Sequence, residues 1–267
     1  MSECPTILLF DSGLGGLTVF RKVKATRPDA RIIYVADDAF FPYGAHGEAE
    51  LVGRVVPLIG ELIEQHRPHL VVIACNTAST IVLPRLRGRY AVPFVGTVPA
   101  IKPACAASQT KRVSVLGTEG TVSREYTRAL IRDFANGAEV TLVGSVKLAA
   151  LAEAELRGTP ADDAAIAQEI APCFIDGGGR RTDTIVLACT HFPLLLGRLQ
   201  RLAPWPVSFI DPAPAIARRV AELVGPPVAS TNPSTTMPAE IMFTSGKPPS
   251  GELEATLAEF GLVCMSR

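Results

Sequence analysis

The sequence predicts an α/β protein with two similar domains, mainly parallel sheets, and an active site in the cleft between the domains. Three observations lead to this prediction. Short apolar runs alternate with amphipathic stretches, as in parallel strands joined by helices. The chain has 267 residues, enough for two small domains that each bury a core. Short sequence patterns of the first half recur in the second half.

The apolar runs define the expected strands, and the amphipathic stretches between them define the expected helices. The strands are expected at residues 6–10, 31–36, 70–74, 94–96, 112–116, 139–143, 184–188, 207–210 and 241–244. The helices are expected at residues 17–25, 48–65, 123–134, 147–157, 161–175 and 213–223. The stretch 225–238 is rich in Pro, Gly and Thr, which predicts a loop.

The repeated patterns pair a hydroxyl-bearing turn with a cysteine-bearing turn. Residues 71–77 and 185–191 both run from an apolar strand into Ala-Cys and then into polar residues. Upstream of these, strand 7–10 leads into Asp11-Ser12-Gly13, and strand 113–116 leads into Gly117-Thr118. Ligands of open α/β sheets bind at the carboxyl ends of strands. We therefore expect one domain from residues 1–98 and 211–267, another from 99–210, and one such pair of turns in each.

Composition and the N-terminal sequence exclude several classes of partner. Lys and Arg together number 26, as do Asp and Glu, so no net charge favours nucleic acid or an anionic membrane. The first residues lack the basic region of a signal peptide, and the apolar run 7–10 is too short for one. A membrane span needs roughly 20 apolar residues, which no run supplies. We expect a cytoplasmic protein.

The cysteines indicate proton chemistry better than they indicate a metal site. None of the six forms a C-x-x-C pair, so we expect free thiols and no metal. Cys75 and Cys189 each stand where a buried strand gives way to a helix, whose positive end stabilises a thiolate. Pro84 predicts that the helix after Cys75 is short and restarts there, and Pro193 suits the first turn of the helix after Cys189. One such thiol is usually a packed core residue, but a matched pair favours catalysis.

Three further motifs stand near these strand ends. The glycine-rich turn that begins at Asp11 has the spacing G-x-G-G and no P-loop lysine, which argues against a nucleotide site. Its backbone N–H groups and the Ser12 hydroxyl are expected to hold an anionic group while Asp11 faces an ammonium group; an ordinary tight turn is the alternative. Tyr43, in a rigid turn after Asp37-Asp38, is a candidate pocket wall, although a surface turn also fits. His191 is a plausible proton partner of Cys189.

These motifs together resemble the glutamate racemases of the aspartate/glutamate racemase superfamily. The resemblance extends over essentially the whole chain and includes Asp211-Pro212 and the segment 243–246. The matching residues are those of segments 10–16, 42–44, 74–79, 117–121 and 187–194. The resemblance implies glutamate as the small-molecule substrate, no cofactor, frequent homodimers, and supply of D-glutamate for peptidoglycan.

The resemblance also implies roles for individual residues. Cys75 and Cys189 correspond to the two proton donors and acceptors, and Thr118 and Thr121 to residues that hold the substrate carboxylate. An acidic residue supports the second cysteine; Glu153 is the candidate and Glu155 the alternative. The remaining residues implied to bind substrate or tune the thiols are Asp11, Ser12, Tyr43, Gly44, Asn76, Thr77, Thr190 and His191.

Racemisation has a chemical logic that fits two matched half-sites. The two enantiomers have equal free energy, so one acid/base group on each face of the substrate serves both directions. The α-proton is weakly acidic, and its removal needs desolvation and oriented donors. Three alternatives stay open: a racemase for another amino acid such as aspartate, a Cys-His hydrolase that would leave Cys75 without a role, and a binding protein that catalyses no proton exchange.

Overall fold

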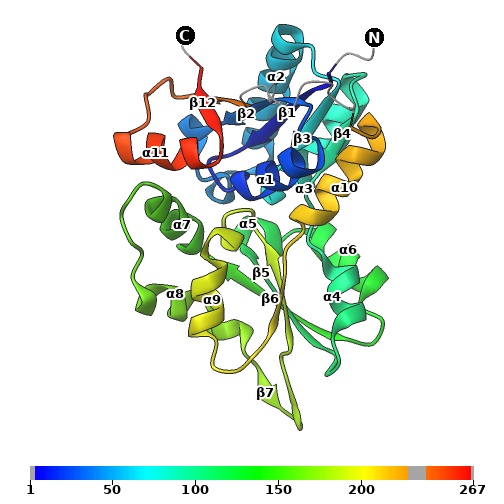
Figure 1. The fold of residues 1–267 in the computed structure, drawn as a ribbon. Coiled ribbons are helices and arrows are strands. Elements are labelled where there is room, and N and C mark those ends of the chain that lie inside the picture. Colours follow the sequence, from blue (N-terminus) through cyan, green and yellow to red (C-terminus); the bar gives the residue numbers. More distant parts are fainter. Residues whose placement is uncertain (1–3, 228–238, 266–267) are drawn as a thin grey trace. The chain divides into compact units, whose positions relative to one another are not determined.

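The structure, a computed structural model, describes residues 4–227 and 239–265. It confirms the predicted class, a mixed α/β protein whose two main sheets are parallel (Figure 1). The chain divides into two compact units, one formed by Met1–Thr97 with Ala213–Arg267 and the other by Val98–Pro212. Most of the predicted loop, residues 228–238, lies outside the described residues. Within the described ranges, no helix is long and apolar enough to cross a membrane.

The first unit is built on a six-stranded sheet with the order β12-β11-β2-β1-β3-β4. Its strands are β1 (Thr6–Asp11), β2 (Arg31–Ala36), β3 (Leu70–Ile73), β4 (Phe94–Gly96), β11 (Ala239–Phe243) and β12 (Leu262–Cys264). Its helices are α1 (Leu17–Thr26), α2 (Glu48–His66), α3 (Asn76–Arg89), α10 (Ala213–Val224) and α11 (Gly251–Glu259), with short 3-10 turns η1 (Asp38–Phe40) and η2 (Tyr43–Ala45). Because β2 and β3 pair with opposite edges of β1, the strand order reverses between β1 and β3.

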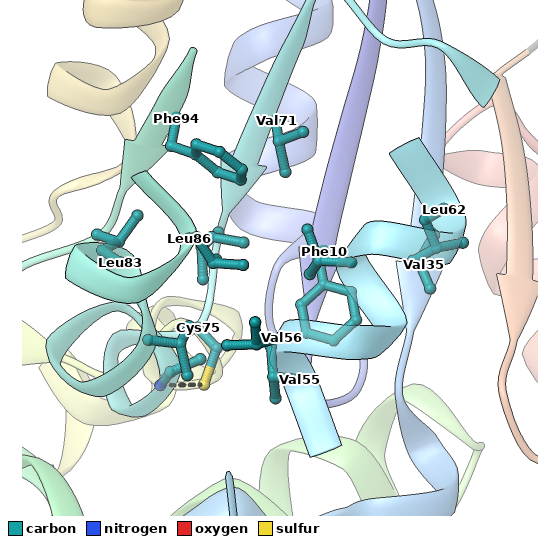
Figure 2. Close-up of a cluster of buried hydrophobic side chains, with 14 of the residues drawn as sticks. Phe10, Val35, Val55, Val56, Leu62, Val71, Cys75, Leu83, Leu86 and Phe94 are labelled. Carbon is teal, nitrogen blue, oxygen red and sulfur yellow. Dashed lines mark hydrogen bonds between the residues drawn. The ribbon is translucent and has the colours of Figure 1, made fainter. Parts of the chain in front are cut away.

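The core on one face of this sheet fixes where Cys75 lies. Apolar side chains of α2 recur at helical spacing and pack with α3 against the buried strands (Figure 2). Figure 2 shows Cys75 within this cluster, its sulfur joined by a hydrogen bond to a backbone nitrogen. Labelled members of the cluster include Phe10, Val35, Val55, Val71 and Leu86. The Cys75 side chain is therefore packed among apolar side chains.

The second unit contains a smaller sheet with the order β10-β9-β5-β6. Its strands are β5 (Arg112–Thr118), β6 (Glu139–Ser145), β9 (Thr184–Ala188) and β10 (Ser208–Ile210), and a separate hairpin joins β7 (Asp176–Gly177) to β8 (Arg180–Arg181). Its helices are α4 (Ile101–Ala107), α5 (Glu119–Val122), α6 (Glu125–Phe134), α7 (Leu148–Leu156), α8 (Asp163–Ile170) and α9 (Leu196–Leu202), with 3-10 turns η3 (Ala171–Cys173) and η4 (Phe192–Leu195). Here the strand order reverses between β5 and β9.

The sequence echo has a structural counterpart inside each unit. In the first unit Phe10 is in register with Ile73, so the turn after β1 lies beside the turn that holds Cys75. In the second unit Gly117 is in register with Ala188, so Thr118 lies beside Cys189. Both pairs of turns stand at the carboxyl ends of strands where the strand order reverses, which is where open α/β sheets bind ligands.

Several predicted helix boundaries were wrong. Helix α3 runs without interruption through Pro84, because one proline removes a single backbone hydrogen bond while the buried side chains around it keep the helix packed. After Cys189 the chain forms the 3-10 turn η4 before α9, so this thiol does not cap an α-helix. The expected helix 123–134 starts at Glu125, and the expected helix 161–175 is limited to Asp163–Ile170. The short elements α4, α9, α11 and β12 had no periodic signal.

Candidate functional site

The predicted site residues form two sets, one in each unit. In the first unit, Asp11 ends β1 and its side chain is fully buried. Its Oδ1 accepts hydrogen bonds from the Ser12 hydroxyl and the Gly13 backbone N–H, each at 3.1 Å, while Tyr34 donates to the Gly13 carbonyl at 2.8 Å. The donors expected to hold an anion therefore point at Asp11, since a carboxylate at a turn captures the nearest N–H and O–H groups. Asp11 is the anionic feature of this turn.

Cys75 is the N-cap residue of α3. Its Sγ accepts a hydrogen bond from the Ala78 backbone N–H at 3.5 Å, and only 6% of the residue is exposed. A sulfur in this position receives the positive potential of the helix N-terminus, which favours the thiolate. The local geometry thus supplies what the sequence pattern predicted for this thiol.

The next residue, Asn76, carries a buried amide at the start of α3. The residue is 2% exposed, and neither its Nδ2 nor its Oδ1 has a hydrogen-bond partner among the described residues. Leaving a buried amide unpaired costs about 1–3 kcal/mol per group. Thr77 follows and is also buried. These side chains are suited to bind a polar group that enters next to Cys75.

Tyr43 is fixed by a buried carboxylate, Asp37, that was not among the predicted site residues. Its hydroxyl donates to Asp37 Oδ2 at 2.6 Å, and Arg54 Nη2 and the Thr244 hydroxyl donate to Oδ1 at 2.6 Å and 2.5 Å. Burial raises the Asp37 pKa, but hydrogen bonds from Arg54, Thr244 and Tyr43 outweigh it and bring the pKa below its ordinary value. Gly44 lies beside Tyr43 in η2 and contributes backbone only.

The hydroxyl of Tyr43 is consequently unsuited to proton transfer. Burial raises its pKa far above the ordinary value, and the negative charges of Asp37, Cys75 and Asp11 add to the effect. Tyr43 belongs to the same buried cluster as Cys75. Tyr43 therefore offers an aromatic wall whose hydroxyl stays protonated and bound to Asp37. The signal that could have found Asp37 is its position directly after β2, next to β1.

In the second unit, two threonine hydroxyls stand at the end of β5. Thr118 caps α5: its Oγ1 accepts from the Thr121 backbone N–H at 3.2 Å and lies 3.0 Å from the Thr121 hydroxyl. Thr121 is fully buried, and its carbonyl accepts a hydrogen bond from Thr127. The paired hydroxyls form a small polar surface beside the strand end that carries Cys189.

Cys189 stands at the head of a line of polar side chains. Its Sγ lies 3.8 Å from Nδ1 of His191, and Nε2 of His191 lies 3.0 Å from Oε1 of Glu153 on α7. Arg157 then donates from Nη2 to Oε2 of Glu153 at 3.2 Å. Cys189, His191 and Glu153 are all buried, as is Thr190 between the first two.

The state of His191 follows from these contacts. Burial by itself lowers its pKa, but the hydrogen bonds to Cys189 and Glu153 and their negative charges outweigh burial and raise the pKa well above the ordinary value. A protonated His191 donates to Cys189 and to Glu153 at the same time. The structure thereby places Glu153 beside His191, whereas Glu155, the alternative, accepts from Arg198 at 2.8 Å.

The chemistry available is proton transfer at two thiols. One thiol is supported by a helix N-terminus near Asp11, and the other by a protonated imidazole backed by a carboxylate. Among the residues that the structure describes, no group of three or more His, Cys, Asp or Glu side chains is placed to hold a metal ion.

Comparisons with known proteins agree on one family. Residues 17–220 match the family described as Asp/Glu/Hydantoin racemase. A glutamate racemase of Brucella ovis is 51% identical over 257 residues, which cover 96% of this chain and 92% of that protein. A glutamate racemase of Brucella anthropi is 57% identical over 221 residues, which cover 82% of this chain and 80% of that protein.

Solved structures give the same relationship. The crystal structure of Escherichia coli glutamate racemase in complex with L-glutamate and the activator UDP-MurNAc-ala is 38% identical, with a TM-score of 0.88. The match covers 98% of this chain and 97% of that one. The crystal structure of Thermus thermophilus glutamate racemase in complex with β-chloro-D-alanine is 28% identical, with a TM-score of 0.72, and the match covers 98% of this chain and 97% of that one.

Proposed function

The chain belongs to the Asp/Glu/hydantoin racemase family, as an isomerase of the glutamate racemase kind, and we propose that Cys75 and Cys189 interconvert L- and D-glutamate without a cofactor. The observation that carries this proposal is the matched pair of half-sites. Each unit presents a buried thiol at the carboxyl end of a strand where the strand order reverses. We further propose that the two units are the predicted domains.

The proposed reaction conserves every proton. Starting from L-glutamate, the Cys189 thiolate removes the α-proton and becomes a thiol, which leaves a carbanion at Cα. The Cys75 thiol then donates its proton to the opposite face, gives D-glutamate, and becomes a thiolate. From D-glutamate the roles are exchanged. Because one thiol must be ionised and the other protonated, kcat/KM is expected to have a bell-shaped pH dependence.

The supporting residues stabilise the charges of the substrate. Asp11 is the proposed partner of the ammonium group, since it is a buried carboxylate at the end of β1, beside the turn that holds Cys75. The unpaired amide of Asn76 is a proposed donor to a substrate carboxylate. Oriented donors of this kind stabilise a developing carbanion more than water does. The other proposed binding groups are Ser12, Tyr43, Thr77, Thr118, Thr121 and Thr190.

We also propose that the protein acts in the cytoplasm as a homodimer and supplies D-glutamate for peptidoglycan, as the family resemblance implies. If so, cells depleted of the protein grow only when D-glutamate is added. Growth that does not depend on D-glutamate would argue against the biosynthetic role without affecting the catalytic proposal.

The direct test is racemisation by purified protein that has been dialysed against EDTA and receives no pyridoxal phosphate. Both glutamate enantiomers should be racemised, faster than L-aspartate. Cys75→Ala and Cys189→Ala should each abolish racemisation, because each removes an obligatory proton carrier. Cys105→Ala, which alters a buried core thiol of the second unit, is the matched control and should retain activity.

Each alternative function predicts a different result. An aspartate racemase would prefer aspartate, and a Cys-His hydrolase would keep its activity in Cys75→Ala. A binding protein would bind glutamate without exchanging its α-proton. Activity that disappears on dialysis and returns with metal would overturn the cofactor-free mechanism.

A further inference from the structure

We infer that Arg157 is a positioning residue for the Cys189 half of the racemisation, acting through Glu153 on His191. This inference rests on the proposed function. It adds to the reaction a residue that lies outside every motif by which the site was predicted.

The geometry is a continuous line of contacts. Glu153 uses Oε1 toward His191 at 3.0 Å and Oε2 toward Arg157 at 3.2 Å, so its two oxygens have different partners. Arg157 is the residue after the last turn of α7, and its backbone N–H donates to the carbonyls of Glu153 and Ala154. Backbone and side chain of Arg157 thus both hold the turn that carries Glu153. Rotation of the carboxylate away from His191 would break the Arg157 contact.

The burial of Glu153 distinguishes this pair from an ordinary surface ion pair. The Arg157 side chain is 42% exposed, but that of Glu153 is only 9% exposed. In the Arg132–Glu125 pair on α6, both side chains are largely exposed, at 62% and 70%. Exposed pairs contribute little to stability because water screens them. A cation next to a buried carboxylate acts on a charge that water screens less.

Several other charged side chains on α7, α8 and α9 have partners other than Glu153 and His191. His191 faces Cys189 from the end of β9 and Glu153 from α7. On α8 and α9, Arg198 donates to Glu155 and Asp163, and Arg201 also donates to Asp163. The remaining acidic groups bind backbone or hydroxyl donors: Asp162 caps α8 and Glu169 accepts from Ser145. Arg157 is a cation in direct contact with Glu153.

The consequence is a defined electrostatic effect on His191. Removing the positive charge of Arg157 leaves the charge of Glu153 less compensated, so His191 holds its proton more firmly. A unit charge acting through a partly solvated medium over several ångströms shifts a titration by about 0.5–1 pH unit. Arg157→Gln should therefore move the midpoint of the His191 titration to higher pH by about that amount. Arg157→Lys keeps the charge, so its His191 midpoint should stay close to that of the parent protein.

The experiment is NMR titration of the imidazole groups in the full-length protein. The chain has four histidines, and His191→Asn assigns the signal of His191. The other three, His46, His66 and His69, belong to the first unit and serve as internal references that should not move. Arg132→Gln, which breaks the exposed pair on α6, is the matched control variant and should leave the His191 titration unchanged.

Activity measured on the same variants separates this inference from the proposed function. In Arg157→Gln the pH profile of kcat/KM should move in the same direction as the His191 titration. The movement should be equal for both enantiomers, because their free energies are equal. An unchanged His191 midpoint overturns the role of Arg157, whatever the activity. A lowered midpoint would show that Glu153 leaves His191 when Arg157 is replaced, and would support positioning of the carboxylate over a purely electrostatic effect. A raised midpoint with an unmoved profile supports the link from Arg157 to His191 but overturns the part of Arg157 in the Cys189 half of the reaction, while the role of Cys189 itself is decided by Cys189→Ala.

Discussion

Adding one methyl group at Gly16 should damage the site by displacing Asp11. Gly16 precedes α1 with φ −59° and ψ −9°, a conformation that alanine adopts freely. Backbone strain is therefore excluded, and only space decides the effect. A Cβ at this position would lie 2.8 Å from Asp11 Oδ2 and 2.8 Å from the Tyr34 hydroxyl.

The size of the effect follows from how little these neighbours can move. Ordinary contact begins at 3.4 Å, so each oxygen is about 0.6 Å too close. Asp11 is held by Ser12 and Gly13, and Tyr34 is bound to the Gly13 carbonyl. Overpacking of this kind costs about 1–3 kcal/mol in the free energy of unfolding. A misplaced site group costs up to roughly 100-fold in rate, and we expect at least a tenfold loss of kcat/KM.

The assay compares Gly16→Ala with Gly53→Ala. Gly53 lies inside α2, where an added Cβ meets nothing within 4 Å, so alanine there should stabilise the protein by up to about 1 kcal/mol. Urea unfolding gives the stability change, and optical rotation of glutamate follows racemisation. If Gly16→Ala were as stable and as active as the parent protein, or lost stability while keeping full activity, the proposed role of Asp11 would be refuted.

Three further predictions concern buried charges and thiols. Arg27 is 1% exposed and forms an ion pair with Asp29. Arg27→Met leaves the Asp29 charge uncompensated, so it should lower the free energy of unfolding in urea by about 3–5 kcal/mol without changing the kcat of folded protein. A loss below about 1 kcal/mol would contradict this prediction. The Asp37 pKa is lowered in the folded protein, so the folded protein protonates Asp37 less readily than the unfolded chain does. The ionised Asp37 therefore contributes to the free energy of unfolding; this contribution is complete above the unfolded pKa of about 3.9 and is lost as the pH falls through the lower folded pKa. Asp37→Asn should therefore have a lower free energy of unfolding in urea than the parent protein near neutral pH, and the difference should become smaller in acid. A difference that does not change with pH would contradict this prediction. Burial raises the pKa of Cys173 to about 12, so iodoacetamide at mildly alkaline pH should modify the exposed Cys4 but not Cys173 in native protein, as read by peptide mass spectrometry; equal modification would be inconsistent.

The parts of the fold that were predicted are those whose signal is local. Strand β3 is an uninterrupted apolar run, and strands β1, β5 and β9 are mostly apolar and almost wholly buried. Such runs are read from the sequence because a strand buried on both faces has no polar alternation. Short helices such as α4 have too few residues for a period to show.

The parts of the site that were missed depend on contacts between distant segments. Asp37 meets Arg54 from α2 and Thr244 from the turn after β11, which lies 207 residues further along the chain. No spacing rule relates such positions. Glu153 and His191 are separated by 38 residues, and only the packing of α7 against η4 brings them together. Glu153 was named through the resemblance and His191 from its place beside Cys189, but their contact with each other was not predicted.

The two-base exchange is tested most directly by running the reaction from L-glutamate in deuterated water and stopping it early. The thiolate that removes the α-proton retains it, while the opposite thiol, already exchanged with solvent, delivers deuterium. We expect D-glutamate that carries deuterium at Cα, and remaining L-glutamate that is almost wholly protiated. Deuterium entering the recovered L-glutamate as fast as product forms, or D-glutamate that keeps the original proton, would contradict it.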